Sequence, residues 1–177
     1  MIVKKTIIKG LYKIKLKKFY DHRGIFYRNY CSKKLNSVIK KKFVQSNISI
    51  NKHKYTLRGF HYQKSPSKEF KLINIISGKI FNVTLDLRKN SKSYGKIYST
   101  LLDEKKNDSI YIPEGCANAF LTLSKNTIVH YLMGDYYKPN SYICFNYKSK
   151  SLKIKWPHIP SVISKQDKNS SAIILDR

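Results

Sequence analysis

Short runs of β-branched and aromatic residues, separated by turn residues, fill most of this 177-residue chain and constrain its fold more than any other feature. Such runs are typical of strands. We expect strands at Lys13–Phe19, Gly24–Tyr30, Phe43–Ile50, Thr56–Gln63, Lys71–Ser77, Gly78–Leu87, Lys96–Leu102, Ser109–Ile112, Ala119–Leu123, Thr127–Met133 and Ser141–Tyr147. Ser77-Gly78 predicts a hairpin turn between the runs that flank it, and Cys31–Lys41 predicts one short helix with Ser32 as its N-cap. This pattern indicates an all-β sandwich, barrel or jelly roll, and the length fits a single domain over residues 1–177.

The composition predicts a folded protein without a membrane partner. Hydrophobic residues make up 41% of the chain and aromatic residues 13%, which is enough for a core. No apolar run approaches the roughly 20 residues of a membrane span, and the N-terminus lacks the features of a signal peptide. Cys31, Cys116 and Cys144 lie far apart, so we expect neither a disulfide framework nor a CxxC metal site. These features predict a soluble, reduced, cytoplasmic protein.

The net charge is extreme, with 36 Lys and Arg against 10 Asp and Glu, a formal +26. Such a charge suggests an anionic partner. However, only five of these residues are arginine, the side chain best suited to forking onto phosphates and bases, and the lysines are spread from end to end. We therefore expect a solvated basic surface and no nucleic-acid partner.

The spacing of the histidines and glycines does not predict a metal site or a phosphate-binding loop. The five histidines show no metal-pair spacing, and the glycines never fall in GxGxxG or GxxxxGK spacing. The densest polar segment is Thr56–Gln63, where Arg58 and His61 are three residues apart. Strict alternation would place them on opposite faces of a strand, but a bulge at Gly59 would re-aim one of them. Taken alone, this segment is also compatible with an exposed edge strand.

A series of short motifs in a fixed order adds a resemblance to these observations. The motifs are Asp21-His22-Arg23-Gly24-Ile25-Phe26, Gln45-Ser46-Asn47, Leu57-Arg58-Gly59-Phe60-His61-Tyr62-Gln63, Lys71-Leu72, Val83-Thr84-Leu85-Asp86-Leu87-Arg88, Ile112-Pro113-Glu114-Gly115, Tyr136-Tyr137-Lys138-Pro139, Trp156-Pro157 and Ser164-Lys165-Gln166-Asp167. Together they resemble the dTDP-4-dehydrorhamnose 3,5-epimerase family of nucleotide-sugar epimerases over roughly residues 10–170.

The resemblance implies a cupin-like jelly roll without metal or cofactor, usually assembled as a homodimer. It implies a nucleoside-diphosphate 4-keto-6-deoxy sugar as substrate. The 4-keto group acidifies the hydrogens on C3 and C5, so a base can remove one of them to form an enolate. An acid on the other face then returns a proton, and a donor or cation near O4 stabilises the oxyanion.

The matching positions imply a role for each residue. His61 resembles the base, Asp167 its orienting partner, Lys71 the enolate stabiliser and Tyr131 the acid, although Tyr137 remains an alternative acid. The resemblance further implies two arginines that contact the diphosphate or sugar and two polar groups that orient the substrate, namely Arg23 and Arg58, and Gln45 and Asn47.

Departures from the family pattern indicate a shifted substrate or regiochemistry. Asn118 stands where the family commonly has histidine, and Asn82 where it has aspartate, which would leave Lys71 less neutralised. Arg28 replaces a glutamate that could meet the nucleotide, and Lys148-Ser149-Lys150 replaces an Asn-Asp-Pro segment. The enzyme could therefore act at C3 only or at both carbons. Its substrate could be GDP-linked, including a 4-keto heptose.

The leading interpretation is an epimerase that makes a deoxy-sugar precursor for surface polysaccharide or capsule. A 3,4-ketoisomerase of the same superfamily is an alternative, but retention of both His61 and Tyr131 favours inversion. Two non-catalytic alternatives are a basic β-sandwich that binds an anionic ligand and an inactive homologue.

Overall fold

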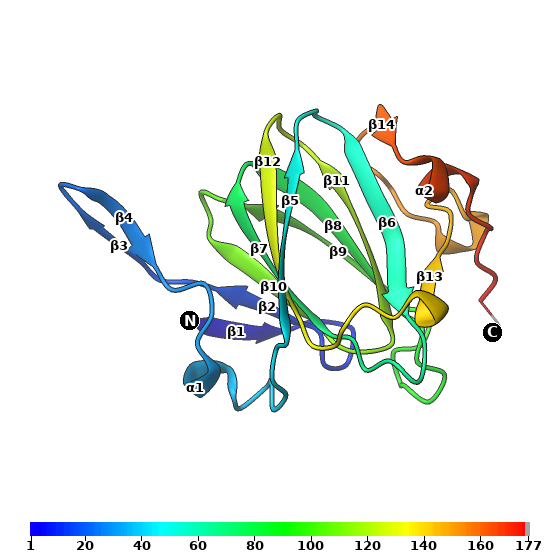
Figure 1. Ribbon diagram of the computed structural model, residues 1–177, viewed down its shortest axis with the longest axis horizontal. Coiled ribbons are helices and arrows are strands. Elements are labelled where there is room, and N and C mark those ends of the chain that lie inside the picture. The colour runs from blue at the N-terminus through cyan, green and yellow to red at the C-terminus, as the bar shows by residue number, and fades with distance from the viewer. Residues whose placement is uncertain (176–177) are drawn as a thin grey trace.

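Two sheets packed face to face form the body of the protein in the computed structural model, which describes residues 1–175 (Figure 1). The first sheet has the strand order β1 (Ile2–Lys5), β2 (Tyr12–Lys15), β10 (Asp108–Ile112), β7 (Lys71–Ser77), β12 (Thr127–Met133) and β5 (Gln45–Asn51). The second has the order β13 (Tyr142–Cys144), β6 (Thr56–Gln63), β11 (Cys116–Thr122), β8 (Lys79–Asp86) and β9 (Ile97–Asp103), with β14 (Val162–Ile163) parallel to β6. This architecture confirms the all-β, cupin-like jelly roll.

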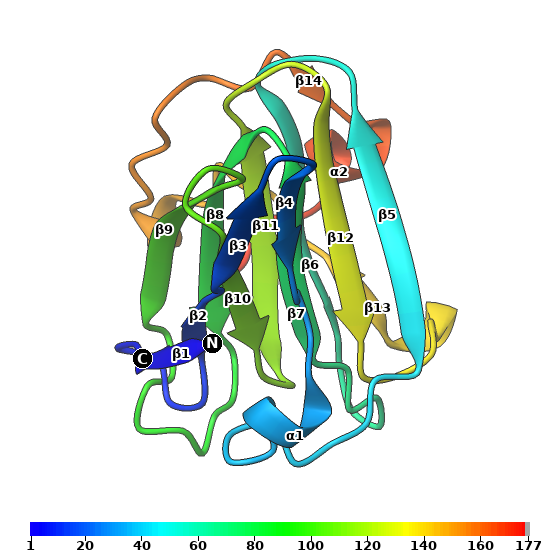
Figure 2. The same cartoon turned by 90° about the vertical axis from the view of Figure 1, so that its left-hand side faces the viewer.

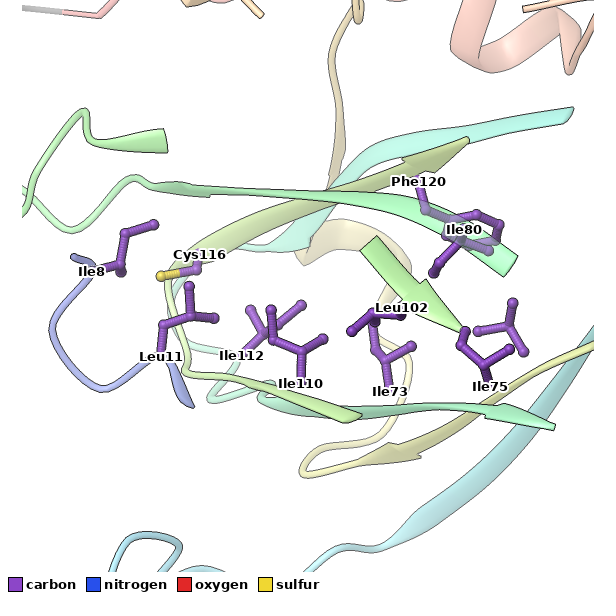
Figure 3. Close-up of a cluster of buried hydrophobic side chains, with 11 residues drawn as sticks. Ile8, Leu11, Ile73, Ile75, Ile80, Leu102, Ile110, Ile112, Cys116 and Phe120 are labelled. Atoms are coloured by element: carbon purple, nitrogen blue, oxygen red, sulfur yellow. The ribbon is translucent and has the colours of Figure 1, made fainter. Parts of the chain in front are cut away.

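The core lies between the sheets because alternate residues of each strand point inward. Figure 3 shows the central cluster, in which Ile73 and Ile75 of β7 meet Ile80 of β8 and Phe120 of β11. A further cluster covers the outer face of the second sheet, where Phe60 and its neighbours pack under the C-terminal segment. The central strands β6, β11 and β8 of the second sheet are therefore covered on both faces, whereas the edge strand β9 is partly exposed.

Two short helices and a separate hairpin complete the described chain. The helices are α1 (Ser32–Leu35) and α2 (Lys165–Asn169), and two single 3₁₀ turns span Pro139–Ser141 and Lys150–Leu152. Strands β3 (Lys18–Asp21) and β4 (Gly24–Tyr27) pair only with each other within residues 1–175 and project away from the sandwich (Figure 1). Figure 2 looks onto this hairpin, which stands in front of the first sheet. None of the helices in the described residues could span a membrane.

Three expected strands have the observed bounds, namely Thr56–Gln63, Lys71–Ser77 and Thr127–Met133. The expected run Lys13–Phe19 is divided between β2 and β3, because the chain leaves the sandwich for the hairpin after Leu16. Strands β1 and β14 and helix α2 were not expected.

The predicted hairpin at Ser77-Gly78 is wrong, because β7 and β8 lie in different sheets. Gly78 has a φ of +84° and turns the chain from one sheet to the other. The predicted helix over Cys31–Lys41 is also wrong in its extent, since only Ser32–Leu35 is helical. Cys31, not Ser32, occupies the N-cap position, and its side chain makes no capping hydrogen bond. Asn36, a poor helix former, follows the single turn.

Candidate active site

A cavity of about 340 Å³ opens between the inner faces of the two sheets. The predicted site residues that line it are Arg58, His61 and Asn118 from the second sheet and Asn47, Lys71 and Tyr131 from the first. Lys71 shares its strand face with the core residues Ile73 and Ile75, and Asn118 shares its face with Phe120. The cavity therefore continues the core region at one end of the sandwich, where polar side chains replace apolar ones.

A bulge in β6 brings Arg58 and His61 into the same cavity, as predicted. His61 pairs with Asn118 of β11 and Arg58 with Phe120, so two residues of β6 face the single Ala119. Gly59 has a φ of +105°, and a Cβ there would collide with the carbonyl oxygen of Asn118 and with Ala119. Only glycine fits this close approach, which re-aims the side chain of His61.

His61 and Asp167 form a hydrogen-bonded pair, with 2.6 Å between Nε2 and Oδ1. Helix α2 presents Asp167, and its N-cap Ser164 accepts the backbone N–H of Asp167 through its side chain. Burial opposes ionisation of Asp167, but hydrogen bonds from His61, Cys144 and the amide of Gly59 outweigh it and lower the pKa of Asp167. Because an ionised carboxylate only accepts, Nε2 of His61 carries a proton, and in the neutral form of the ring the lone pair is on Nδ1.

His61, Cys144 and Asp167 together place three atoms of metal-ligand type within 4.8 Å of one another. Burial and the nearby Asp167 raise the pKa of the Cys144 thiol to about 12, so the thiol is protonated and donates to Asp167. The 2.6 Å contact between His61 and Asp167 is a hydrogen-bond distance, shorter than the roughly 3.3 Å between two ligands of a tetrahedral zinc ion. The geometry suits a hydrogen-bonded pair for proton transfer.

The first sheet supplies a tyrosine and a lysine to the cavity. Tyr131 packs against the central core cluster, and burial raises the pKa of its hydroxyl, although Arg58 and Ser49 act in the opposite direction. Lys71 lies within 2.9 Å of the carboxylate of Glu69, and both side chains are nearly buried. Glu69 therefore supplies Lys71 with a negative partner even though position 82 is an asparagine. The site thus combines a neutral acid with a paired cation.

The two amides that depart from the family pattern contact each other. The side-chain nitrogen of Asn118 donates to Oδ1 of Asn82, at 2.8 Å, and to the carbonyl oxygen of Val83, at 2.9 Å. Asn82 is fully buried beneath Asn118 and does not line the cavity. Arg58 donates from Nε to Oδ1 of Asn51, at 2.8 Å, which fixes its guanidinium beside the cavity.

Besides Asn82, three predicted substrate-binding residues do not line the cavity of their own chain. Gln45 accepts the backbone N–H of Tyr137 but does not line the cavity. Arg23 is exposed at the tip of the β3–β4 hairpin, where it pairs with Asp21. Arg28 lines a different hollow, together with Met1, Lys17, Phe19, Phe26 and Lys34.

Two residues of the site, Tyr142 and Glu69, carried no sequence signal. The ring of Tyr142 lies 5.3 Å from that of His61 and lines the cavity, and burial raises the pKa of its hydroxyl. Tyr137, which the sequence offered as an alternative acid, is exposed, and its ring makes an edge-to-face contact with the ring of Tyr142. Tyr142 is one of 14 tyrosines, and Glu69 follows a polar segment with the features of a loop, so neither stood out.

Comparison with known proteins places the chain in a family. The family model of dTDP-4-dehydrorhamnose 3,5-epimerase matches residues 5–174. The Salmonella typhimurium protein of that name is 33% identical, over 100% of this chain and 97% of the relative.

Solved structures agree with this assignment. The Legionella pneumophila enzyme RmlC, in complex with dTDP-4-keto-L-rhamnose, has a TM-score of 0.91 and 32% identity, over 97% of this chain and 92% of that one. The 3′-monoepimerase ChmJ of Streptomyces bikiniensis, in complex with dTDP-quinovose, has a TM-score of 0.86 and 26% identity, over 93% and 84% of the two chains. The chain therefore belongs to the dTDP-4-dehydrorhamnose 3,5-epimerase family and is a carbohydrate epimerase with the cupin jelly-roll fold.

Proposed function

We propose that this epimerase inverts C3, or both C3 and C5, of a nucleoside-diphosphate 4-keto-6-deoxy sugar. The observation that carries this proposal is the placement of His61 and Tyr131 on opposing sheets, facing one cavity. Inversion needs a base and an acid on opposite faces of the sugar ring, and this arrangement supplies them.

The proposed reaction begins when the free lone pair on Nδ1 of His61 removes a proton next to the 4-keto group. The electron pair moves to O4 as an enolate, which the ammonium of Lys71 stabilises. Tyr131 then gives its hydroxyl proton to the same carbon from the opposite face. The cycle closes when His61 loses its extra proton and Tyr131 regains one by exchange with water. Asp167 holds the His61 ring and stabilises the imidazolium.

The nucleotide we favour is dTDP, because the matched relatives are named for dTDP sugars. The departures at Asn82, Asn118 and Arg28 motivate GDP-linked hexoses and heptoses as the competing substrates. Asn118 directs its amide nitrogen to Asn82 and Val83, so it faces the cavity as a neutral group. A neutral amide can form a hydrogen bond with a sugar hydroxyl but cannot form an ion pair with a phosphate.

A homodimer is part of this proposal, because Arg23 and Arg28 lie on or next to a hairpin that leaves its own sandwich. Phe19 and Phe26 of this hairpin are more than half exposed, at 52% and 65%. A protruding hairpin with exposed aromatic residues is suited to a protein partner. A second copy of this chain would bury those rings and bring Arg28 to a substrate bound in the neighbouring cavity.

Solvent deuterium exchange tests the function. We expect wild type in D₂O to introduce one deuterium into the sugar if it acts at C3 only, and two if it acts at C3 and C5. The dTDP- and GDP-linked sugars are run in parallel, and the one that exchanges identifies the nucleotide. The His61→Asn variant is expected to introduce none. Absence of enzyme-dependent exchange with every sugar would contradict the proposal. That the product serves surface-polysaccharide synthesis, and that the enzyme is located in the cytoplasm, remain predictions.

A further inference from the structure

Glu69 links the two sheets at the edge of the cavity through a single buried carboxylate. One oxygen lies 2.9 Å from Nζ of Lys71, which begins β7 in the first sheet. The other accepts the side-chain amide of Gln63, which ends β6 in the second sheet, at 2.9 Å. The side chains of Glu69 and Lys71 are only 8% and 11% exposed, so water screens this pair poorly.

Gln63 extends this bridge to a third segment. Its amide oxygen accepts the backbone N–H of Lys138 at 2.6 Å, and its nitrogen donates to the carbonyl oxygen of Tyr136 at 3.1 Å. This segment leads through the 3₁₀ turn at Pro139–Ser141 to Tyr142, which lines the cavity. Glu69 therefore contacts Lys71 directly. Through Gln63 it is also linked to the segment 136–142, which ends in Tyr142 at the cavity.

We propose that Glu69 is a positioning residue for the epimerase reaction, which fixes the ammonium of Lys71 beside the enolate oxygen. This inference rests on the proposed role of Lys71. A lysine side chain has many rotamers, and a nearby fixed carboxylate restricts them. The ammonium has three N–H donors, so a bond to Glu69 leaves two for O4 of the substrate. Glu69 itself touches neither the sugar nor the transferred proton.

The test compares Glu69→Gln with wild type on the sugar that wild type converts. Glutamine keeps the shape and can still accept from Gln63, but it no longer attracts Lys71 electrostatically. We expect kcat to fall about tenfold or more, with KM within about twofold of wild type, because positioning acts mainly in the transition state. In a Lys71→Met background, Glu69→Gln should cause no further loss, because its effect acts through the lysine.

Asp135→Asn is the matched control. The carboxylate of Asp135 holds the same segment through Lys138 Nζ, at 2.7 Å, and the hydroxyl of Ser67, at 2.9 Å, but it does not contact Lys71. We expect its kcat to stay within about twofold of wild type. An equal loss of kcat in Asp135→Asn and Glu69→Gln would overturn the proposal, since the position of the segment alone would explain both.

The remaining outcomes separate the inference from the proposed function. Full activity of Glu69→Gln, or an undiminished effect in the Lys71→Met background, would overturn the role of Glu69 and leave the epimerase proposal standing. No conversion by wild type would overturn both. Should Glu69→Gln not fold, Glu69→Asp serves instead, because it keeps the buried charge but is too short to reach Lys71 and Gln63 together. Its kcat is expected below wild type, and an unchanged kcat would overturn the proposal.

Discussion

Nε2 of His61 and Oδ1 of Asp167 lie 2.6 Å apart, although the two residues are 106 positions apart in the sequence. Asp167 is 3% exposed and has a second anchor, because its Oδ2 accepts the amide of Gly59 at 3.2 Å. The bulge that re-aims His61 and the carboxylate that orients its ring are therefore joined at Gly59. In the neutral imidazole this arrangement favours the tautomer with its proton on Nε2, which leaves the lone pair on Nδ1, the atom proposed above as the proton acceptor.

Asp167→Asn is expected to lower kcat by about 10²–10⁴-fold, because an amide can donate to Nε2 and so favour the wrong tautomer. Substrate binding should change little, since Asp167 does not line the cavity that His61 and Tyr131 share. Steady-state kinetics together with calorimetric binding of substrate check both points. A kcat within twofold of wild type would show that His61 needs no orienting carboxylate.

Tyr131→Phe is expected to separate proton removal from inversion. The base His61 remains in place, so deuterium from solvent should still enter the substrate, while inversion slows by about 10²-fold or more. Deuterium NMR of recovered substrate and product distinguishes these outcomes. Tyr142→Phe is the comparison, because Tyr142 lies on β13 in the same sheet as the base. Greater loss of inversion in Tyr142→Phe than in Tyr131→Phe would assign the acid role to Tyr142.

The sequence could predict those features of the site that depend on local geometry. Alternation placed Arg58 and His61 on opposite faces of one strand, and Gly59 offered a bulge to bring them together, which the register of β6 and β11 confirms. The resemblance to the epimerase family then indicated that Asp167 and Tyr131 belong to the same site. The structure brings both residues to His61 or to its cavity.

Features that depend on long-range packing could not be predicted. Alternation looks the same in a hairpin and in two strands of different sheets, so the turn at Gly78 was assigned wrongly. The pairing of Glu69 with Lys71 spans two residues, but nothing in the sequence says that both side chains are buried together. The sequence likewise does not show that Phe19 and Phe26 of the β3–β4 hairpin remain more than half exposed within one chain.

Mixed subunits are expected to show that the active site is shared between chains. His61→Asn and Arg28→Ala should each be inactive as homodimers. Co-expression should give mixed dimers in which one site carries both defects and the other carries neither, restoring about a quarter of wild-type activity for random pairing. Differently tagged chains and light scattering verify the dimers. No recovery above the sum of the parents would place Arg28 outside the site of the second copy.

Asp86→Asn is expected to lower the free energy of unfolding by about 3 kcal/mol, because it breaks a buried ion pair. The Asp86 side chain is fully buried, and its Oδ2 lies 2.7 Å from Nη2 of Arg88. Ser91 and Ser93 also donate to it, at 2.8 and 2.6 Å. Chemical denaturation at pH 7 measures the change. Asp21→Asn is the matched control, because Asp21 and Arg23 form the same pair in exposed surroundings, where stability should hardly change.

The loss in Asp86→Asn should also depend on pH. Burial opposes ionisation of Asp86, but the hydrogen bonds from Arg88, Ser93 and Ser91 lower its pKa to about 2, against 3.8 for an unperturbed carboxyl. A carboxylate whose folded pKa is depressed adds stability above its unfolded pKa, here about 2 kcal/mol, and loses it as the pH falls through the folded value. The difference in unfolding free energy between wild type and Asp86→Asn should therefore be constant from about pH 5 to 7 and narrow toward about pH 2. The other carboxylates are present in both proteins, so their contributions cancel in this difference. A difference in unfolding free energy that stays constant down to about pH 2 would show that Asp86 is not held ionised by Arg88.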